Sequence, residues 1–142
     1  MTKNTNKINS EGWRFDNTYS KLPEAMLSRL GPIPVKAPKI VILNIALSNK
    51  LGLDFSNTSN ESLALIFSGN KLPEGTDTIA QAYAGHQFGH FTILGDGRAI
   101  VIGEHLSKNN QRFDIQFKGS GKTPFSRNGD GRAALGPMLR EY

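Results

Sequence analysis

Residues 91–102 read FTILGDGRAIVI and residues 113–117 read FDIQF. Both stretches are rich in β-branched and aromatic residues, which favour strands. The tetrapeptide GDGR at 95–98 interrupts the first stretch, and Asp-Gly pairs of this kind are typical of hairpin turns. We therefore predict three short antiparallel strands, the first two joined as a hairpin: Phe91–Leu94, Ala99–Ile102 and Phe113–Phe117.

Helical patterns lie on both sides of this predicted sheet. Apolar residues recur at helical spacing before Gly52, which stands where a helix stop is expected, and Ser59 or Asn60 can cap a second helix. We predict helices over four ranges: 40–51, 61–67, 77–84 and 133–142. The expected fold class is α+β, with an N-terminal helical arm, a small antiparallel sheet and a helix.

The first part of the chain divides into two regions. Residues 1–12 are rich in Asn, Lys, Thr and Ser, and we predict a disordered tail there because so few apolar residues cannot offset the entropy of ordering. Residues 13–38 mix aromatic residues with four prolines, which break helices and favour extended chain. We predict an arm that packs on another surface, and one structural unit over residues 13–142.

Composition excludes several classes of protein. The 142 residues contain no cysteine, so disulfides, thiolate nucleophiles and zinc-thiolate or iron–sulfur sites are excluded. No apolar run approaches the roughly 20 residues of a membrane span, and the first residues lack the apolar centre of a secretory signal. We expect a cytoplasmic protein. The net charge of +5 favours an anionic partner without separating a nucleotide from a nucleic acid.

The spacing of three features is typical of a kinase small lobe. Lys118 ends the last predicted strand, 21 residues after Gly97, and Glu141 lies 23 residues further on the last predicted helix. In kinases a glycine-rich turn covers the nucleotide phosphates, a strand lysine binds them, and a helix glutamate pairs with the lysine. The GDGR turn could place its backbone amides and Arg98 over phosphates. The alternatives are an ordinary turn and an unrelated surface Lys and Glu.

A glycine-rich basic loop follows, over residues 119–136. Its Lys122, Arg127 and Arg132 could meet anionic phosphates, with Asp130 as an orienting group, although a solvated loop has the same composition. A P-loop is rejected because Gln116 stands where that motif requires glycine.

Other catalytic and binding patterns have little support. His86 and His90 are four residues apart but lack the adjacent Glu of a metalloprotease helix, so we interpret them as packing histidines. No Gly-x-Ser-x-Gly elbow is present, which leaves a serine hydrolase without support. Four phenylalanines fit a buried sheet face better than an RNA-stacking platform: Phe88, Phe91, Phe113 and Phe117.

Longer motifs resemble one family. YAGHQFGHF (83–91), LGDGRA (94–99), DIQFKGSGKTPFSR (114–127) and GDGRAALGPMLREY (129–142) resemble the selenoprotein O family of protein adenylyltransferases. A weaker likeness reaches upstream through Phe15-Asp16-Asn17 and residues 51–54. Members of the family resemble protein kinases in fold and transfer AMP from ATP to protein hydroxyls. In these members the nucleotide lies reversed relative to its orientation in protein kinases, so that the α-phosphate is attacked instead of the γ-phosphate.

The resemblance implies a set of residue roles. It assigns ATP contacts to Gly95, Gly97, Arg98, Lys118, Asp130 and Gly131, and an ion pair with Lys118 to Glu141. Two positions depart from the family pattern, because Asn128 stands where a basic residue is expected and Lys122 where Arg is usual.

The resemblance also implies which parts of the enzyme lie elsewhere. The catalytic aspartate and the ligands of Mg²⁺ or Mn²⁺ belong to a large lobe, so this chain corresponds to the N-terminal portion, with no catalytic residue or metal ligand and no activity alone. The implied partners are ATP and protein substrates, with no nucleic acid and no membrane. The alternative is a non-catalytic nucleotide-binding or interaction module.

Overall fold

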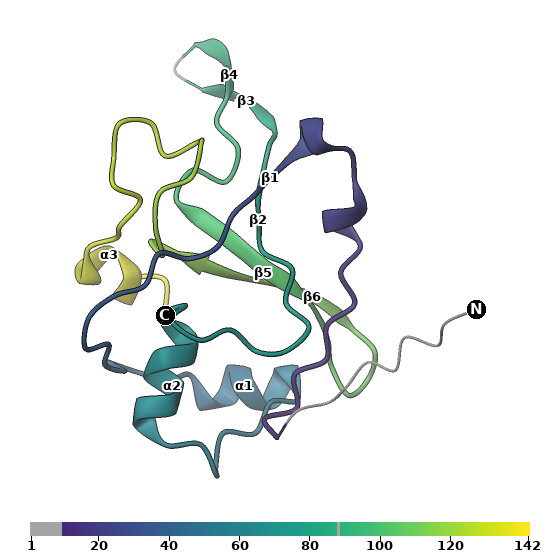
Figure 1. Ribbon diagram of the computed structural model, residues 1–142, viewed down its shortest axis with the longest axis vertical. Helices are drawn as coiled ribbons and strands as arrows, with labels where there is room; N and C mark the ends of the chain where they lie inside the picture. The colour runs from purple at the N-terminus through teal and green to yellow at the C-terminus, as the bar shows by residue number, and fades with distance from the viewer. Residues whose placement is uncertain (1–9, 88) are drawn as a thin grey trace.

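The computed structural model describes residues 10–87 and 89–142, and the first nine residues of the predicted tail lie outside this part. A four-stranded antiparallel sheet forms its centre, in the order β1-β2-β5-β6 (Figure 1). The strands of this sheet are β1 (Leu27–Arg29), β2 (Ile79–Gln81), β5 (Ala99–Leu106) and β6 (Arg112–Lys118). The predicted α+β class, with a small antiparallel sheet and few helices, is confirmed.

A second sheet contains only β3 (Ala84–Gln87) and β4 (His90–Ile93), which project from the body as a hairpin (Figure 1). The predicted hairpin between residues 91–94 and 99–102 is therefore wrong, since Ile93 of β4 lies opposite Ala84 of β3. After β4 the chain turns sharply through Gly95 and Gly97, both with positive φ, and enters a different sheet. A glycine turn shows where the chain changes direction but does not identify the strand that pairs next.

Helix α2 (Asn60–Phe67) matches its predicted range, and α1 is shorter than predicted, at Ile45–Leu51. The Ser59 hydroxyl caps α2 by accepting the Ser62 amide hydrogen at 3.2 Å. Helix α1 starts late because the Asn44 side chain accepts the Leu47 amide hydrogen at 2.9 Å, and it ends at left-handed Gly52 as predicted. Local capping chemistry thus sets both helix starts.

Two predicted helices differ in the structure. The range 77–84 contains β2 instead, because the Asp77 amide donates to the Ile102 carbonyl and Ile79 pairs with Val101 of β5. Pairing with a buried central strand overrides the helical spacing of that short segment. The last helix, α3, covers only Leu135–Leu139 of the predicted range 133–142. Among the described residues, none of the helices has the length and apolar character to cross a membrane.

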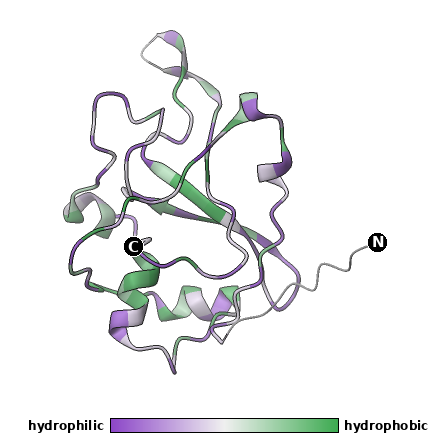
Figure 2. Ribbon diagram, viewed as in Figure 1, coloured by the Kyte–Doolittle hydropathy of each residue, from purple (hydrophilic) through white to green (hydrophobic). Residues whose placement is uncertain are grey.

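The arm packs on the sheet, as predicted. It contains two short 3-10 helices, η1 (Tyr19–Lys21) and η2 (Glu24–Met26), together with β1. Trp13 and Phe15 are buried and form a core with Leu53, Phe55, Leu63 and Ile102. Hydrophobic residues are concentrated along β5 and helix α2 (Figure 2), and the buried ones include Ile100, Ile102 and Leu63.

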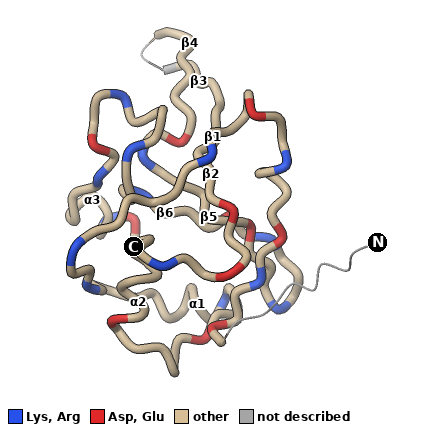
Figure 3. Tube along the Cα trace, in the orientation of Figure 1, with Lys and Arg blue, Asp and Glu red and all other residues tan. Residues whose placement is uncertain are grey.

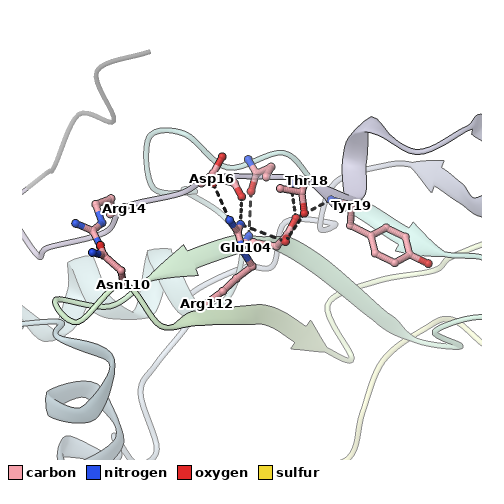
Figure 4. Close-up of polar contacts among 8 residues, drawn as sticks. Arg14, Asp16, Thr18, Tyr19, Glu104, Asn110 and Arg112 are labelled. Carbon is pink, nitrogen blue, oxygen red and sulfur yellow. Dashed lines mark hydrogen bonds and ion pairs between the residues drawn. The ribbon is translucent and has the colours of Figure 1, made fainter. Parts of the chain in front are cut away.

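Glu104 of β5 fixes the arm to the sheet (Figure 4). The residue is 5% exposed, and its carboxylate accepts hydrogen bonds from the Thr18 amide, the Thr18 hydroxyl (2.8 Å) and the Tyr19 amide (2.7 Å). Burial would raise the pKa of Glu104, but these donors and the Arg112 guanidinium outweigh burial and lower it. Arg112 also pairs with Asp16 at 2.7 Å, so the arm is held by charge as well as by packing.

Candidate functional site

Three segments meet at one end of the β5–β6 pair: the glycine turn (residues 95–98), Lys118 and the basic loop (residues 119–136). Lys118 lies opposite Ala99, the first residue of β5. The Gly119 amide donates to the Arg98 carbonyl at 2.9 Å, and Ser120 forms an isolated bridge with Arg132. The fold therefore brings every residue to which ATP contact was assigned to the same end of the sheet.

Lys118 and Glu141 form an ion pair, with 2.6 Å between Nζ and Oε1. Their side chains are 41% and 55% exposed. Glu141 lies just beyond the end of α3 rather than inside a helix, and its amide donates to the Met138 carbonyl at 3.1 Å. The expected pairing is present in the structure, while its role in ATP binding stays a prediction.

The glycine turn does not present the row of free amides that its composition suggested. The amides of Gly95, Asp96 and Gly97 donate to the carbonyls of Tyr83, Gln81 and Leu94, at 3.0, 3.0 and 3.2 Å. What the turn offers an anion is the exposed Arg98 side chain, whose Nη1 also donates to the Arg132 carbonyl at 3.2 Å. A planar guanidinium is suited to phosphate recognition.

The two glycines of the turn have different surroundings. A Cβ atom at Gly95 would lie 2.4 Å from the Gln81 carbonyl oxygen and 2.6 Å from the Phe125 ring, so close packing requires glycine there. A Cβ at Gly97 would meet no atom within 4 Å. The Cβ side of Gly97 is therefore open, while the Cβ side of Gly95 is filled by Gln81 and Phe125. The contact of either glycine with ATP stays a prediction.

Asp96 holds the turn in place. Its Oδ2 accepts the Gln81 amide hydrogen at 2.8 Å. Burial raises the pKa of Asp96, although hydrogen bonds from the Gln81 amide and the Tyr83 hydroxyl act in the opposite direction. This carboxylate is thus engaged in the fold of the turn.

The basic loop folds back on itself and brings the backbone of Gly131 against that of Gly121. Gly131 has a φ of +73°, and a Cβ there would lie 2.0 Å from the Gly121 carbonyl oxygen. The exposed Asp130 accepts the Arg132 amide hydrogen at 2.8 Å through Oδ1. Asp130 and Gly131 therefore shape the loop, and their contact with ATP stays a prediction.

A hollow of about 410 Å³ lies between the glycine turn and the basic loop. It is lined by Leu94, Gly95, Asp96, Gly97, Arg98, Phe125, Ser126 and Arg127. Several Lys and Arg positions lie along the basic loop next to it (Figure 3). The volume falls within the range of small-ligand sites, and the surrounding charge favours an anion.

Three residues of the basic loop were missed by sequence reasoning. The hydroxyls of Thr123 and Ser126 both donate to the Gly97 carbonyl, and the Phe125 ring covers Gly95. Thr123 is only 3% exposed. The available signal was the short run TPFS at 123–126, which carries no charge within an otherwise basic, glycine-rich loop.

The histidine and phenylalanine interpretations need correction. His86 and His90 are exposed on the β3–β4 hairpin instead of packed, and Phe91 is 77% exposed. The hairpin stands apart from the main sheet, so no second layer buries its side chains. Phe113 and Phe117 are half-buried, and Phe117 packs against the core; Phe88 lies outside the described residues. Within 10–87 and 89–142, no group of three His, Asp or Glu could hold a metal.

Comparisons with known proteins identify related chains. A family model described as "Protein adenylyltransferase SelO" matches residues 11–142. The protein nucleotidyltransferase YdiU of Pelagibacter ubique is 70% identical over 131 residues, which are 92% of this chain and 27% of the relative. The relative from Nitrosococcus oceani is 64% identical over the same shares, and that from Bacillus cytotoxicus is 59% identical over 142 residues, 100% of this chain and 29% of the relative. The chain thus spans less than a third of the length of these relatives.

Proposed function

This chain belongs to the SelO family of protein adenylyltransferases, and we propose that it supplies the ATP-binding part of an enzyme that transfers AMP to protein hydroxyl groups. The observation that supports ATP binding most directly is the Lys118–Glu141 pair beside the glycine turn. Three sources of positive charge, Arg98, Lys118 and the basic loop, surround one end of the sheet, where they suit a triphosphate. We also propose a cytoplasmic location.

In the proposal, three residues at this end of the sheet bind or orient the nucleotide. The Lys118 ammonium neutralises phosphate oxygens, and Glu141 directs it through their ion pair. Arg98 adds a planar donor from the glycine turn. In the reversed orientation, a substrate hydroxyl forms its new bond to the α-phosphorus while the bond to the β-phosphate bridging oxygen breaks. AMP stays on the protein and pyrophosphate leaves, with the hydroxyl proton accepted by a base outside this segment.

The metal is assigned outside this segment. Asp96 of the glycine turn accepts the amide hydrogen of Gln81 in β2, and Asp130 of the basic loop accepts that of Arg132. Each carboxylate thus has one oxygen committed to the local fold, and we propose that the metal ligands lie outside this segment. A bound divalent cation, Mg²⁺ or Mn²⁺, would neutralise the negative charge of the phosphates.

A chimera tests the proposal. In it, the matching segment of the Pelagibacter ubique relative is replaced by that of this chain, and protein substrates are incubated with ATP labelled on either the α- or the γ-phosphate. We expect α-label on protein and none from the γ-phosphate. Transfer of γ-label would instead indicate kinase chemistry. ATP binding without any transfer, in conditions where the unaltered relative is active, would favour the non-catalytic nucleotide-binding module.

A further inference from the structure

We propose that Thr123 and Ser126 form a hydroxyl latch that holds the glycine turn in the geometry that binds ATP. The two side chains reach Gly97 from the basic loop, across 26 and 29 residues of sequence. They are positioning residues, since they act on the nucleotide through the turn. The identity of the ligand as ATP rests on the proposed function, whereas the hydrogen bonds of the latch do not depend on it.

The latch has a defined set of hydrogen bonds. The Thr123 Oγ1 and the Ser126 Oγ, at 3.1 Å, both donate to the Gly97 carbonyl oxygen. The two hydroxyl oxygens lie 3.2 Å apart. The Thr123 amide donates to Ser126 Oγ at 2.8 Å, and the Phe125 amide donates to Thr123 Oγ1 at 3.1 Å. The loop thus orients its own hydroxyls before they reach the turn.

Gly97 is the position at which such a restraint has most effect. It has a φ of +63° and open space where a side chain would lie, so no side chain of its own anchors it. Glycine also has the largest conformational freedom to lose. Without the two hydroxyls, the peptide between Gly97 and Arg98 is the part of the turn with fewest restraints.

Fixing the Gly97 carbonyl also orients Arg98. The C=O of Gly97 and the N–H of Arg98 belong to the same peptide, which is planar and trans. When the carbonyl is held toward the basic loop, the Arg98 amide points the opposite way, and the Arg98 Cα, which lies in the same plane, is held with it. Arg98 is the cationic member of the turn, so the latch controls the group that we assign to ATP phosphates.

The Phe125 ring restrains the other end of the turn. It lies 2.6 Å from the position of a Cβ at Gly95, in contact with the backbone there. The ring and the two hydroxyls come from four consecutive residues, 123–126, and together they contact both glycines of the turn. The burial of Thr123 means that water cannot readily replace its hydroxyl.

The experiment compares Thr123→Val, Thr123→Ser and Ser126→Ala in the full-length chimera. Valine keeps the shape of threonine without its hydroxyl, and serine keeps the hydroxyl. Hydrogen exchange at the amides of Gly95, Asp96 and Gly97 reports on the turn without any ligand, because all three are hydrogen-bonded. We expect exchange about two- to tenfold faster in the valine variant, the range for one lost hydrogen bond, and unchanged exchange in the serine variant.

Kinetics then test the link to the nucleotide. We expect the KM for ATP to rise severalfold in Thr123→Val and further in the double variant Thr123→Val/Ser126→Ala. The KM for the protein substrate should not change in either variant. Thr123→Ser should keep the activity of the unsubstituted chimera. A latch is refuted if exchange at the turn does not change in the double variant. Faster exchange with an unchanged KM for ATP would overturn the positioning role. If the unsubstituted chimera fails to transfer AMP, the proposed function fails, and the exchange rates still decide whether the latch exists.

Discussion

Replacement of Lys118 by alanine should abolish AMP transfer in the chimera with almost no loss of stability. Both members of the Lys118–Glu141 pair are about half exposed, and exposed ion pairs typically contribute about 0–1 kcal/mol to folding. A domain of this size is stable by about 5–15 kcal/mol, so the variant remains folded. Any large loss of activity must then come from the site.

The expected size of the activity loss follows from the role of the ammonium group. Removal of one preorganised electrostatic contact to a transition state typically lowers kcat about 10²–10³-fold, or roughly 3–4 kcal/mol. Lys118 qualifies as preorganised because β6 fixes its backbone opposite Ala99 and Glu141 holds its Nζ at 2.6 Å. We therefore expect kcat to fall by at least about 10²-fold, with an unfolding midpoint close to that of the parent.

Lys122 provides the matched control. It is an exposed lysine only four residues away, in the basic loop, where a flexible side chain and salt screening reduce its effect. Lys122→Ala should lower kcat/KM by less than about tenfold, or about 1.4 kcal/mol. Glu141→Gln should give an intermediate loss. The double variant Lys118→Ala/Glu141→Gln should be no worse than Lys118→Ala, because Glu141 acts through Lys118.

The assay is transfer of α-labelled AMP to protein, with urea unfolding of each variant alongside. Equal losses for Lys118→Ala and Lys122→Ala would refute the assignment of Lys118. A drop in unfolding free energy of several kcal/mol in Lys118→Ala would refute the claim that the pair has little structural role. Additive losses in the double variant would show that Glu141 does not act through the lysine.

Three further predictions concern the arm, the basic loop and the isolated chain. Glu104→Gln should lower the unfolding free energy by about 2–3 kcal/mol at pH 7, because an amide lacks one acceptor for donors that bind a charged group. The pKa of Glu104 is lower in the folded state than its ordinary 4.5, so the parent loses this stabilisation as the pH falls below about 4.5. The difference in unfolding free energy between the parent and Glu104→Gln should therefore be smaller in urea unfolding at pH 4 than at pH 7. Gly131→Ala should destabilise more than Gly97→Ala in urea unfolding, since both have positive φ but only the Cβ at 131 meets backbone, at 2.0 Å; equal losses would contradict this. Residues 1–142 alone should transfer no AMP, and turnover that survives repurification would contradict the assignment of base and metal ligands to the rest of the enzyme.

Local signals in the sequence predicted much of the fold. Strand composition identified β5 and β6, and the capping Ser59 identified the start of α2. The spacing of Lys118 and Glu141 anticipated an ion pair across 23 residues, because a strand end and a following segment return to the same end of the sheet. These features depend on residue type and on contacts between segments that the chain brings back to the same end of the sheet.

Features that depend on a distant partner were not predictable in the same way. Strand β2 exists because Ile79 meets Val101, and no property of residues 77–84 identifies that neighbour. The β3–β4 hairpin competes with an equally plausible pairing across the glycine turn, and the choice is made by the Tyr83 and Gln81 carbonyls that accept amides of that turn. The hydroxyl latch is similar, because a buried Thr in a basic loop acquires meaning only when Gly97 is beside it.

The two ends of β5 are held by different kinds of interaction, and this difference suits a binding site. At the C-terminal end, Glu104 is buried with charged and backbone partners, and His105 is buried between the Arg14 amide and the Leu51 carbonyl. At the N-terminal end, the contacts are the exposed Lys118–Glu141 pair and hydroxyls on a glycine carbonyl. A lysine ammonium has three N–H donors, so Lys118 can keep its ion pair with Glu141 and still donate to a phosphate oxygen without disturbing the core. Lys118 belongs to β6, which pairs with β5 from Ala99 to Leu106, and the far end of β5 is anchored by the buried Glu104 and His105. The backbone that carries Lys118 is therefore held in place, as the proposed role of its ammonium requires.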